Sequence, residues 1–129
     1  MTISVTREWE NAVHRGSIAD LQHLLPDGAD IDARDGHGQT ALMLAASEGH
    51  GHVVDWLVER GAAPDFAAKY GLTALMLAVL RGHVDIVRTL TDAGANVSLR
   101  GKGAPGFAGK TALDLAIALG DPELVEILS

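Results

Sequence analysis

Two overlapping loops carry residues whose types and spacing could bind a phosphate group. The run from Gly101 to Gly106 fits the glycine pattern of a dinucleotide-binding fingerprint. The segment Ala104–Thr111 is close to a phosphate-binding loop, with alanine in place of the first glycine. Such loops work where a buried parallel strand leads into them and a helix follows. The sequence predicts the helix but no parallel sheet, and too few residues follow Thr111 to complete a nucleotide-hydrolysing fold.

A weaker form of the same chemistry remains as an alternative function. We expect the backbone amides of Gly109 and Lys110 to lie at a helix N-terminus, where unpaired N–H groups attract anions. Lys102 belongs to the same region and adds a positive charge. The alternative is therefore an anion- or nucleotide-binding protein that uses the loop Ala104–Thr111.

Two histidines one residue apart, His50 and His52, resemble half of a metal site. A zinc site needs three or four ligands, and no further ligand lies nearby at helical spacing. His50 recurs 33 positions later as His83, which favours a structural role in a repeated unit. The chain has no cysteine, which excludes disulfides, thiolate metal sites and thiol nucleophiles. We therefore expect no metal, no cofactor and no catalytic residues, and hence a protein that is not an enzyme.

The elements that hold these residues belong to an internal repeat. The segment Gly38–Ala45 (Gly-Gln-Thr-Ala-Leu-Met-Leu-Ala) recurs 33 positions later as Gly71–Ala78 with a single change. A further copy begins at Gly109, and its offset of 38 positions indicates that five residues are inserted before it. The same spacing extends towards the N-terminus, where Gly16 precedes Gly49 by 33 positions. Four repeated units are therefore predicted.

The composition of each unit indicates two helices. Thr40, Thr73 and Thr111 each precede a run of alanine and leucine, where a threonine oxygen can accept a hydrogen bond from the first helical turn. Glycine follows each run and favours a left-handed helix end. A second run, with apolar residues three and four positions apart, predicts a second helix. One such pair cannot bury its own apolar face, so we expect the pairs to stack into an elongated all-α solenoid.

This pattern resembles the ankyrin repeat. The resemblance is carried by Thr-Ala-Leu-Met-Leu-Ala-Ala from Thr40, by Glu-Gly-His from Glu48 and by Leu-Val-Glu-Arg-Gly-Ala from Leu57. It extends from about Trp9 to Ser129 and implies stacked helix-turn-helix units with short hairpin loops. Family members usually have proline after the threonine and histidine two residues after that proline. This chain has alanine and methionine at these places after Thr40 and Thr73, and alanine and aspartate after Thr111. The Thr-Ala-Leu-Met variant is similar to bacterial members.

We expect one domain over residues 1–129. Its repeats lie at about 5–34, 35–67, 68–108 and 109–129, and the third carries the inserted hairpin. Terminal units are expected to differ from inner ones because each presents one face to water. No apolar run approaches the ~20 residues of a membrane span, and the N-terminus does not resemble a secretory signal. We therefore expect a cytoplasmic protein that does not contact a membrane, and we expect it to be a monomer.

The resemblance also implies where a partner binds. Ankyrin repeats use a concave face, which is lined by the hairpin tips and by the ends of the first helices. In the 33-residue register, the candidate partner-binding residues are Arg34, His37, Gln39, Lys69, Tyr70, Leu72, Leu80, Arg81, Arg100, Lys102, Phe107 and Lys110. We call this set the candidate face.

The candidate face is basic although the chain is acidic. The formal net charge of −7 argues against a nucleic-acid-binding surface. Together with Arg15, the candidate face holds seven of the ten Lys and Arg residues, whereas only two of the seventeen acids, Asp35 and Glu48, clearly fall on the same concave side. The apolar side chains among these cations are candidate anchors for a partner: Tyr70, Leu72, Leu80 and Phe107. We predict a protein partner with an acidic surface and at least one exposed apolar side chain.

Other interpretations stay open. The Lys and Arg side chains could simply be solvated at the tips of the hairpins and bind no partner, since surface charges usually need no further explanation. Nucleic-acid binding is disfavoured because seven cations spread over four units lack an element that reads bases. As a non-enzymatic interaction module, the chain could act as an adaptor, as an inhibitor of a toxic partner, or as an effector delivered into another cell.

Overall fold

A computed structural model describes residues 7–24 and 30–129. These residues form eight α-helices in four consecutive pairs, and the two helices of each pair contact one another. The pairs are α1 (Arg7–Arg15) with α2 (Ile18–Leu24), α3 (Ala41–Glu48) with α4 (Gly51–Glu59), α5 (Ala74–Leu80) with α6 (Val84–Asp92), and α7 (Ala112–Leu119) with α8 (Pro122–Leu128). The predicted all-α fold is confirmed.

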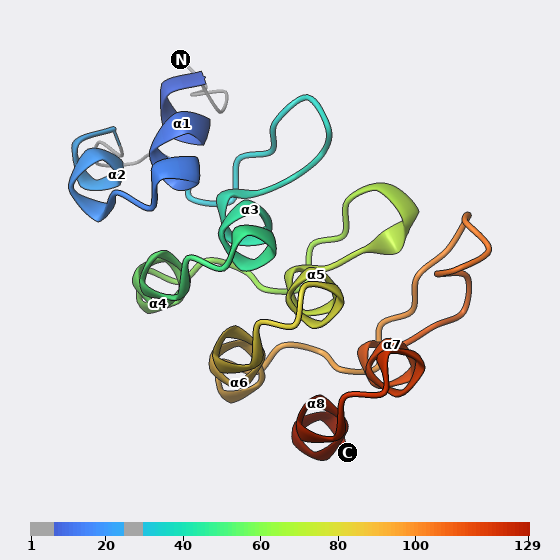
Figure 1. The fold of residues 1–129 in the computed structure, drawn as a ribbon. Coiled ribbons are helices and arrows are strands. Elements are labelled where there is room, and N and C mark those ends of the chain that lie inside the picture. The colour runs from blue at the N-terminus through green and yellow to red at the C-terminus, as the bar shows by residue number, and fades with distance from the viewer. Residues whose placement is uncertain (1–6, 25–29) are drawn as a thin grey trace.

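The four pairs stack side by side in two layers (Figure 1). One layer holds α1, α3, α5 and α7, and the other holds α2, α4, α6 and α8. The segments that lead into α3, α5 and α7 project from the first layer as a row of fingers. We call them finger 1 (residues 30–40), finger 2 (residues 63–73) and finger 3 (residues 96–111). Finger 2 contains a short 3₁₀ helix, η1 (Lys69–Gly71).

Threonine begins the inner helices of the first layer as predicted. The side-chain oxygens of Thr40 and Thr73 accept hydrogen bonds of 3.3 Å from the backbone amides of Met43 and Met76. Both threonines are almost completely buried, at 1% and 2% exposure. The first helical turns carry amides that have no partner inside the helix, and the threonines satisfy one amide in each.

Burial between pairs holds the stack together. Leu42 of α3 and Leu75 of α5 occupy matching positions and are 1% and 2% exposed. In the second layer, Val54 and Val87 are both completely buried. Burying one such side chain stabilises the fold by about 1.5–3 kcal/mol. Helices of seven to nine residues are too short to be stable alone, so packing between neighbouring pairs must provide most of the stability.

Polar contacts fix the spacing of successive units. The Asp32 carboxylate accepts a 2.9 Å hydrogen bond from the Ala63 amide, and the Asp65 carboxylate accepts one of 2.8 Å from the Asn96 amide. The two bonds are equivalent, since both partners are displaced by 33 positions. Each bond ties one finger to the base of the next finger.

The repeated histidines link units at the opposite ends of the first-layer helices. The His50 ring Nε2 lies 2.8 Å from the His14 carbonyl oxygen, and the equivalent His83 Nε2 lies 3.2 Å from the Ser47 carbonyl oxygen. Gly49 makes room for the His83 ring, because a Cβ atom at this position would lie 2.8 Å from it. The structural role that we favoured for the repeated histidine is therefore observed.

The first prediction concerns the threonine caps. Replacing Thr73 with alanine should lower the free energy of unfolding by about 1 kcal/mol, because a buried amide of α5 loses its acceptor. Urea denaturation followed by circular dichroism measures this loss. Thr89→Ala is the matched control, because the Thr89 hydroxyl bonds only the carbonyl of Asp85 within α6 and caps nothing. Equal losses from the two variants would contradict the capping role.

Candidate functional site

Part of the candidate face comes together in a groove. Finger 1 and finger 2 enclose a volume of about 480 Å³ above α5. The groove is lined by Gly36, His37, Gln39, Ala68, Lys69, Tyr70, Leu72 and Leu77. Five of these eight residues are candidates from the sequence, whereas Gly36, Ala68 and Leu77 are additions from the structure.

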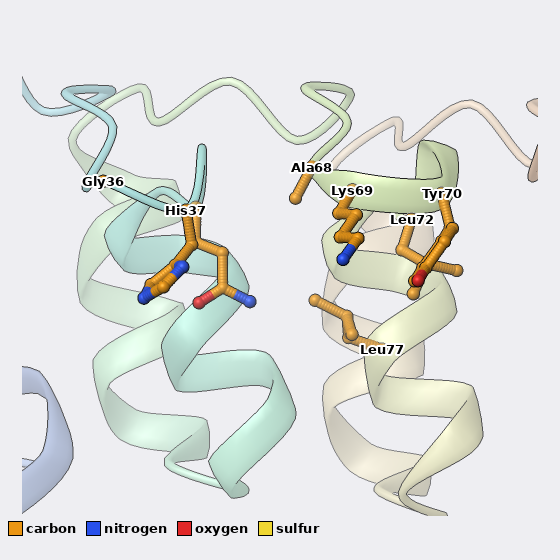
Figure 2. A pocket seen from close by; sticks show the side chains of 8 residues that line it. Gly36, His37, Ala68, Lys69, Tyr70, Leu72 and Leu77 are labelled. Atoms are coloured by element: carbon orange, nitrogen blue, oxygen red, sulfur yellow. The ribbon is translucent and has the colours of Figure 1, made fainter. Parts of the chain in front are cut away.

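The two sides of the groove differ in chemistry. Figure 2 shows His37 on one side, facing Lys69, Tyr70 and Leu72 across the groove. Leu72 and Leu77 are partly buried against the core and give the groove an apolar floor. Lys69 holds its Nζ atom 5.0 Å from the centre of the Tyr70 ring, where a cation and an aromatic face attract each other. The groove thus combines an apolar surface with one full positive charge.

Finger 1 is shaped by an internal carboxylate. One oxygen of Asp35 accepts hydrogen bonds of 2.8 Å from the His37 amide and 2.9 Å from the Gln39 amide. These bonds close the fingertip and place the side chains of His37 and Gln39 at the groove. Asp35 is one of the two acids that the sequence places on the concave side, and one oxygen of its carboxylate is used to close this turn.

Tyr70 has an unusual backbone. Its φ of 64° lies in the left-handed region, and among the described residues it is the one non-glycine residue with a positive φ. That conformation costs roughly 1–2 kcal/mol for an ordinary side chain. Surrounding contacts hold it in place: the Tyr70 carbonyl accepts a 2.8 Å hydrogen bond from the Lys102 amide, and the Tyr70 and Phe107 ring centres lie 5.9 Å apart. Finger 3 therefore supports one wall of the groove.

The inserted residues make finger 3 a closed hairpin. The Gly101 amide donates a 2.8 Å hydrogen bond to the Lys110 carbonyl, and the Gly109 amide donates one of 2.9 Å to the Gly101 carbonyl. The Arg100 guanidinium adds a 2.7 Å bond to the Gly109 carbonyl. The close approach of the two sides of this hairpin requires glycine at position 101, because a Cβ atom there would lie 2.4 Å from the carbonyl oxygen of Phe107.

These hydrogen bonds correct one expectation from the sequence. The amides of Gly109 and Lys110 are not free for an anion, because they donate to the carbonyls of Gly101 and Phe107. The Thr111 hydroxyl is also occupied, since it accepts from the Asp114 amide in the predicted capping box. Within the described residues, the chain near this loop forms only an isolated β-bridge rather than a sheet. The loop lacks the setting in which a phosphate-binding motif works.

The other candidates lie apart from the groove. The Arg34 guanidinium bonds the Ala67 carbonyl at 3.1 Å and stacks 4.6 Å from the centre of the Phe66 ring. Leu80 is partly buried against the core. Arg81 lies at the far end of α5, beside a polar hollow of about 550 Å³ that includes Glu48. The remaining candidates, Lys102 and Lys110, extend from finger 3 and are exposed.

The described residues offer no metal site and no membrane-spanning helix. They contain no group of three or more His, Cys, Asp or Glu side chains placed to hold a metal ion. His52 uses its Nε2 atom in a 2.7 Å contact with the Gly16 carbonyl oxygen, which links neighbouring units. None of the helices in the described ranges is both long and apolar enough to cross a bilayer.

Sequence reasoning missed Leu77 because its register suggested the core. The equivalent residue in α3, Leu44, is indeed buried at 8% exposure. Leu77 is more exposed because it reaches the groove between two fingers that stand apart.

The second prediction tests the support that finger 3 gives to Tyr70. Replacing Gly101 with alanine should open the hairpin, because the new Cβ atom collides with backbone at Phe107. The nuclear Overhauser contact between the Tyr70 and Phe107 rings should then disappear; the chain has one tyrosine and two phenylalanines, which eases assignment. Gly106→Ala is the control, since nothing lies within 4 Å of a Cβ atom there. A ring contact that survives in Gly101→Ala would refute the proposed support.

The third prediction concerns acid stability at the start of α7. The Thr111 amide donates to the Asp114 carboxylate and lowers the pKa of Asp114 below 3.8; the Thr111 hydroxyl and the charge of Lys110 act in the same direction. A carboxyl whose pKa is lower in the folded chain than in the unfolded chain stabilises the fold at pH values above its unfolded-state pKa. This stabilisation is lost as the pH falls through its folded-state pKa. Asp114→Asn should therefore lower the melting temperature at pH 7, and the difference from wild type should shrink below about pH 4.

Thermal melts between pH 2 and pH 7 measure this effect. Asp55→Asn, at an exposed position of α4, is the control with the same change in charge, and it should alter stability little at any pH. A difference between wild type and Asp114→Asn that stays constant with pH would show that the ionised carboxylate plays no part.

Comparison with known proteins agrees with the repeated architecture. A family model described as ankyrin repeats (3 copies) matches residues 10–101. The chain is 50% identical over 52 residues to human ankyrin repeat domain-containing protein 29 and 44% identical over 52 residues to the protein of the same name from Danio rerio. It is 43% identical over 44 residues to a Drosophila melanogaster protein named G patch domain and ankyrin repeat-containing protein 1 homolog.

These matches concern repeats rather than whole proteins. The aligned segments cover 40%, 40% and 34% of this chain, but only 17%, 17% and 13% of the respective relatives. The chain therefore corresponds to a small part of each relative. The family model, in contrast, matches most of the chain, and its range includes α3 to α6 together with the groove between fingers 1 and 2. The repeat, the stacked helix pairs and this match together show that the chain belongs to the ankyrin repeat family.

Proposed function

We propose that this chain is a non-enzymatic protein-binding module, and that the groove between fingers 1 and 2 receives an acidic segment of the partner. The proposal rests on membership of the ankyrin repeat family, whose repeats generally bind proteins. In this groove, an apolar side chain of the partner contacts Leu72, Leu77 and Tyr70, while a neighbouring carboxylate of the partner meets Lys69.

The observation that carries the proposal is the conformation of Tyr70. A left-handed tyrosine persists only where its surroundings hold it, and such strain is concentrated at functional sites. Here the strained residue forms a wall of the groove. It is exposed at 38%, although tyrosine is a large and partly apolar side chain. Tyrosine is also among the residues that dominate binding energy at protein interfaces.

The charges around the fingers favour an acidic partner. Arg34 and Arg100 bond backbone carbonyls, so their side chains are held in place but their charges are not neutralised. Arg15 differs, because it forms an ion pair of 2.7 Å with Asp20. Among the residues that line the groove, Lys69 carries the one full charge; it is exposed, and no ion pair within the described residues neutralises it. A positive charge at this place attracts oppositely charged partners and disfavours like-charged ones.

The fourth prediction uses a displayed peptide library selected on the wild-type protein. Enriched peptides should contain an acidic residue close to a bulky apolar one. Tyr70→Asn should weaken their binding about tenfold or more, because asparagine tolerates the left-handed backbone but removes the aromatic wall.

Lys69→Glu should weaken the binding of the same peptides as well, and the affinity of the wild type for them should fall with rising salt, as expected for exposed charges. Fluorescence anisotropy with synthetic peptides measures the affinities.

Arg88→Glu is the control for a reversal of charge. Arg88 is an exposed residue of α6, which belongs to the second layer, whereas the fingers project from the first layer. Its guanidinium pairs with the Glu123 carboxylate at 3.3 Å. Peptides that bind the groove should bind this variant as tightly as the wild type. Basic peptides from the selection, or acidic ones that tolerate both Tyr70→Asn and Lys69→Glu, would overturn the proposal. Arg81→Glu then reports whether a longer partner also reaches the far end of α5.

A further inference from the structure

One wall of the groove carries a side chain whose charge changes with pH. His37 lines the groove on finger 1, and its ring faces Lys69, Tyr70 and Leu72 of finger 2 (Figure 2). It is exposed to solvent. Among the side-chain types that line the groove, histidine alone ordinarily gains or loses a proton between about pH 5 and pH 8. A proton on this residue adds a second positive charge to the groove.

Hydrogen bonds within finger 1 keep His37 at the groove. One carboxylate oxygen of Asp35 accepts bonds of 2.8 Å and 2.9 Å from the amides of His37 and Gln39. The Gly38 amide, between them, donates a 3.0 Å bond to the Asp35 carbonyl. Because the backbone on both sides of His37 is tied in this way, the residue keeps its place opposite finger 2.

The His37 ring has no hydrogen-bond partner among the described residues. The bond that His37 forms within finger 1 uses its backbone amide, and none of the ion pairs in the described ranges includes its side chain. The rings of His14, His50, His52 and His83 differ, because each contacts a carbonyl or carboxylate oxygen of a neighbouring unit. The ring nitrogens of His37 are therefore available to a ligand.

The groups around this ring leave room for an acidic ligand. Across the groove stand the charged Lys69 and the titratable Tyr70. On finger 1, Asp35 uses one oxygen for the amides of its own loop, and the Arg34 guanidinium bonds a backbone carbonyl of finger 2. The floor is apolar, and the described residues that line the groove include no acid. A carboxylate that enters the groove is therefore the group that would balance a charge on the ring.

We propose that the groove takes up a proton on His37 when it binds an acidic segment, so that mild acid strengthens the binding. This inference rests on the proposed function and adds its regulation by pH. A partner carboxylate that meets Lys69 lies in the groove that His37 faces, where it also attracts a protonated imidazole ring. By linkage, a ligand that favours the protonated form binds more tightly when that form is more populated.

The affinity should pass through a maximum as the pH falls. Between pH 8 and about pH 5.5, histidine gains its proton while aspartate and glutamate side chains of the partner stay ionised, so the affinity rises. Below about pH 4.5, the partner's own carboxyl groups take up protons and the affinity falls. A groove that attracted the partner through lysine alone would show the fall without the preceding rise.

Fluorescence anisotropy tests this proposal with a histidine-free acidic peptide selected on the wild-type protein. The wild-type affinity should rise about two- to fivefold from pH 8 to pH 5.5, as expected for one additional exposed ion pair. His37→Gln should lose this rise, because glutamine is polar but carries no charge at any pH. His23→Gln is the matched control, since His23 is exposed on α2 in the second layer; it should keep the wild-type dependence on pH.

Calorimetry in buffers of different ionisation enthalpy gives a second readout, because it counts the protons taken up on binding. The wild type should take up a fraction of a proton near pH 6.5, and His37→Gln should take up none. Circular dichroism confirms that each variant is folded. Equal affinity at pH 5.5 and pH 8, or a rise that His37→Gln retains, overturns this inference and leaves the proposed function standing. Failure of acidic peptides to bind at any pH contradicts the proposed function, and this inference with it.

Discussion

Burial of apolar side chains between neighbouring helix pairs is the interaction on which the rest of this structure depends. Each helix has seven to nine residues, too few for a stable helix in water without packing partners. Leu42, Leu75, Val54 and Val87 are almost completely buried in a stack whose neighbouring helix pairs contact one another in both layers. The fold therefore has no single centre, and its stability is a sum of contacts between neighbours. A cap such as Thr73 adds to these contacts but does not replace them.

The stack also decides where the fingers stand, and hence the shape of the groove. Adjacent fingers are one unit apart, and the carboxylates of Asp32 and Asp65 tie the base of each finger to the next. Fingers 1 and 2 leave a groove between their tips, whereas fingers 2 and 3 touch through Tyr70 and Phe107. Finger 3, which carries the inserted residues, contacts its neighbour through the Phe107 ring and the Lys102 amide, and these contacts favour the left-handed backbone of Tyr70.

The groove joins two kinds of interaction in one place. Leu72 and Leu77 give it a modest apolar floor, and Lys69 adds a positive charge beside the Tyr70 ring. An apolar contact together with an exposed charge suits the reversible binding of the acidic partner segment that we propose for this groove.

The sequence by itself determined the all-α class, the number of units and the starts of the inner helices, because these depend on local or strictly periodic features. A threonine such as Thr40 caps its own helix, and a residue 33 positions away repeats the environment of its counterpart. The register also selected five of the eight residues that line the groove. Tertiary structure alone decided which candidates meet. Arg100 and the amide of Gly109 bond within finger 3, and the Lys102 amide bonds Tyr70. Those bonds join fingertips whose conformations depend on one another, so no local pattern of residues encodes them.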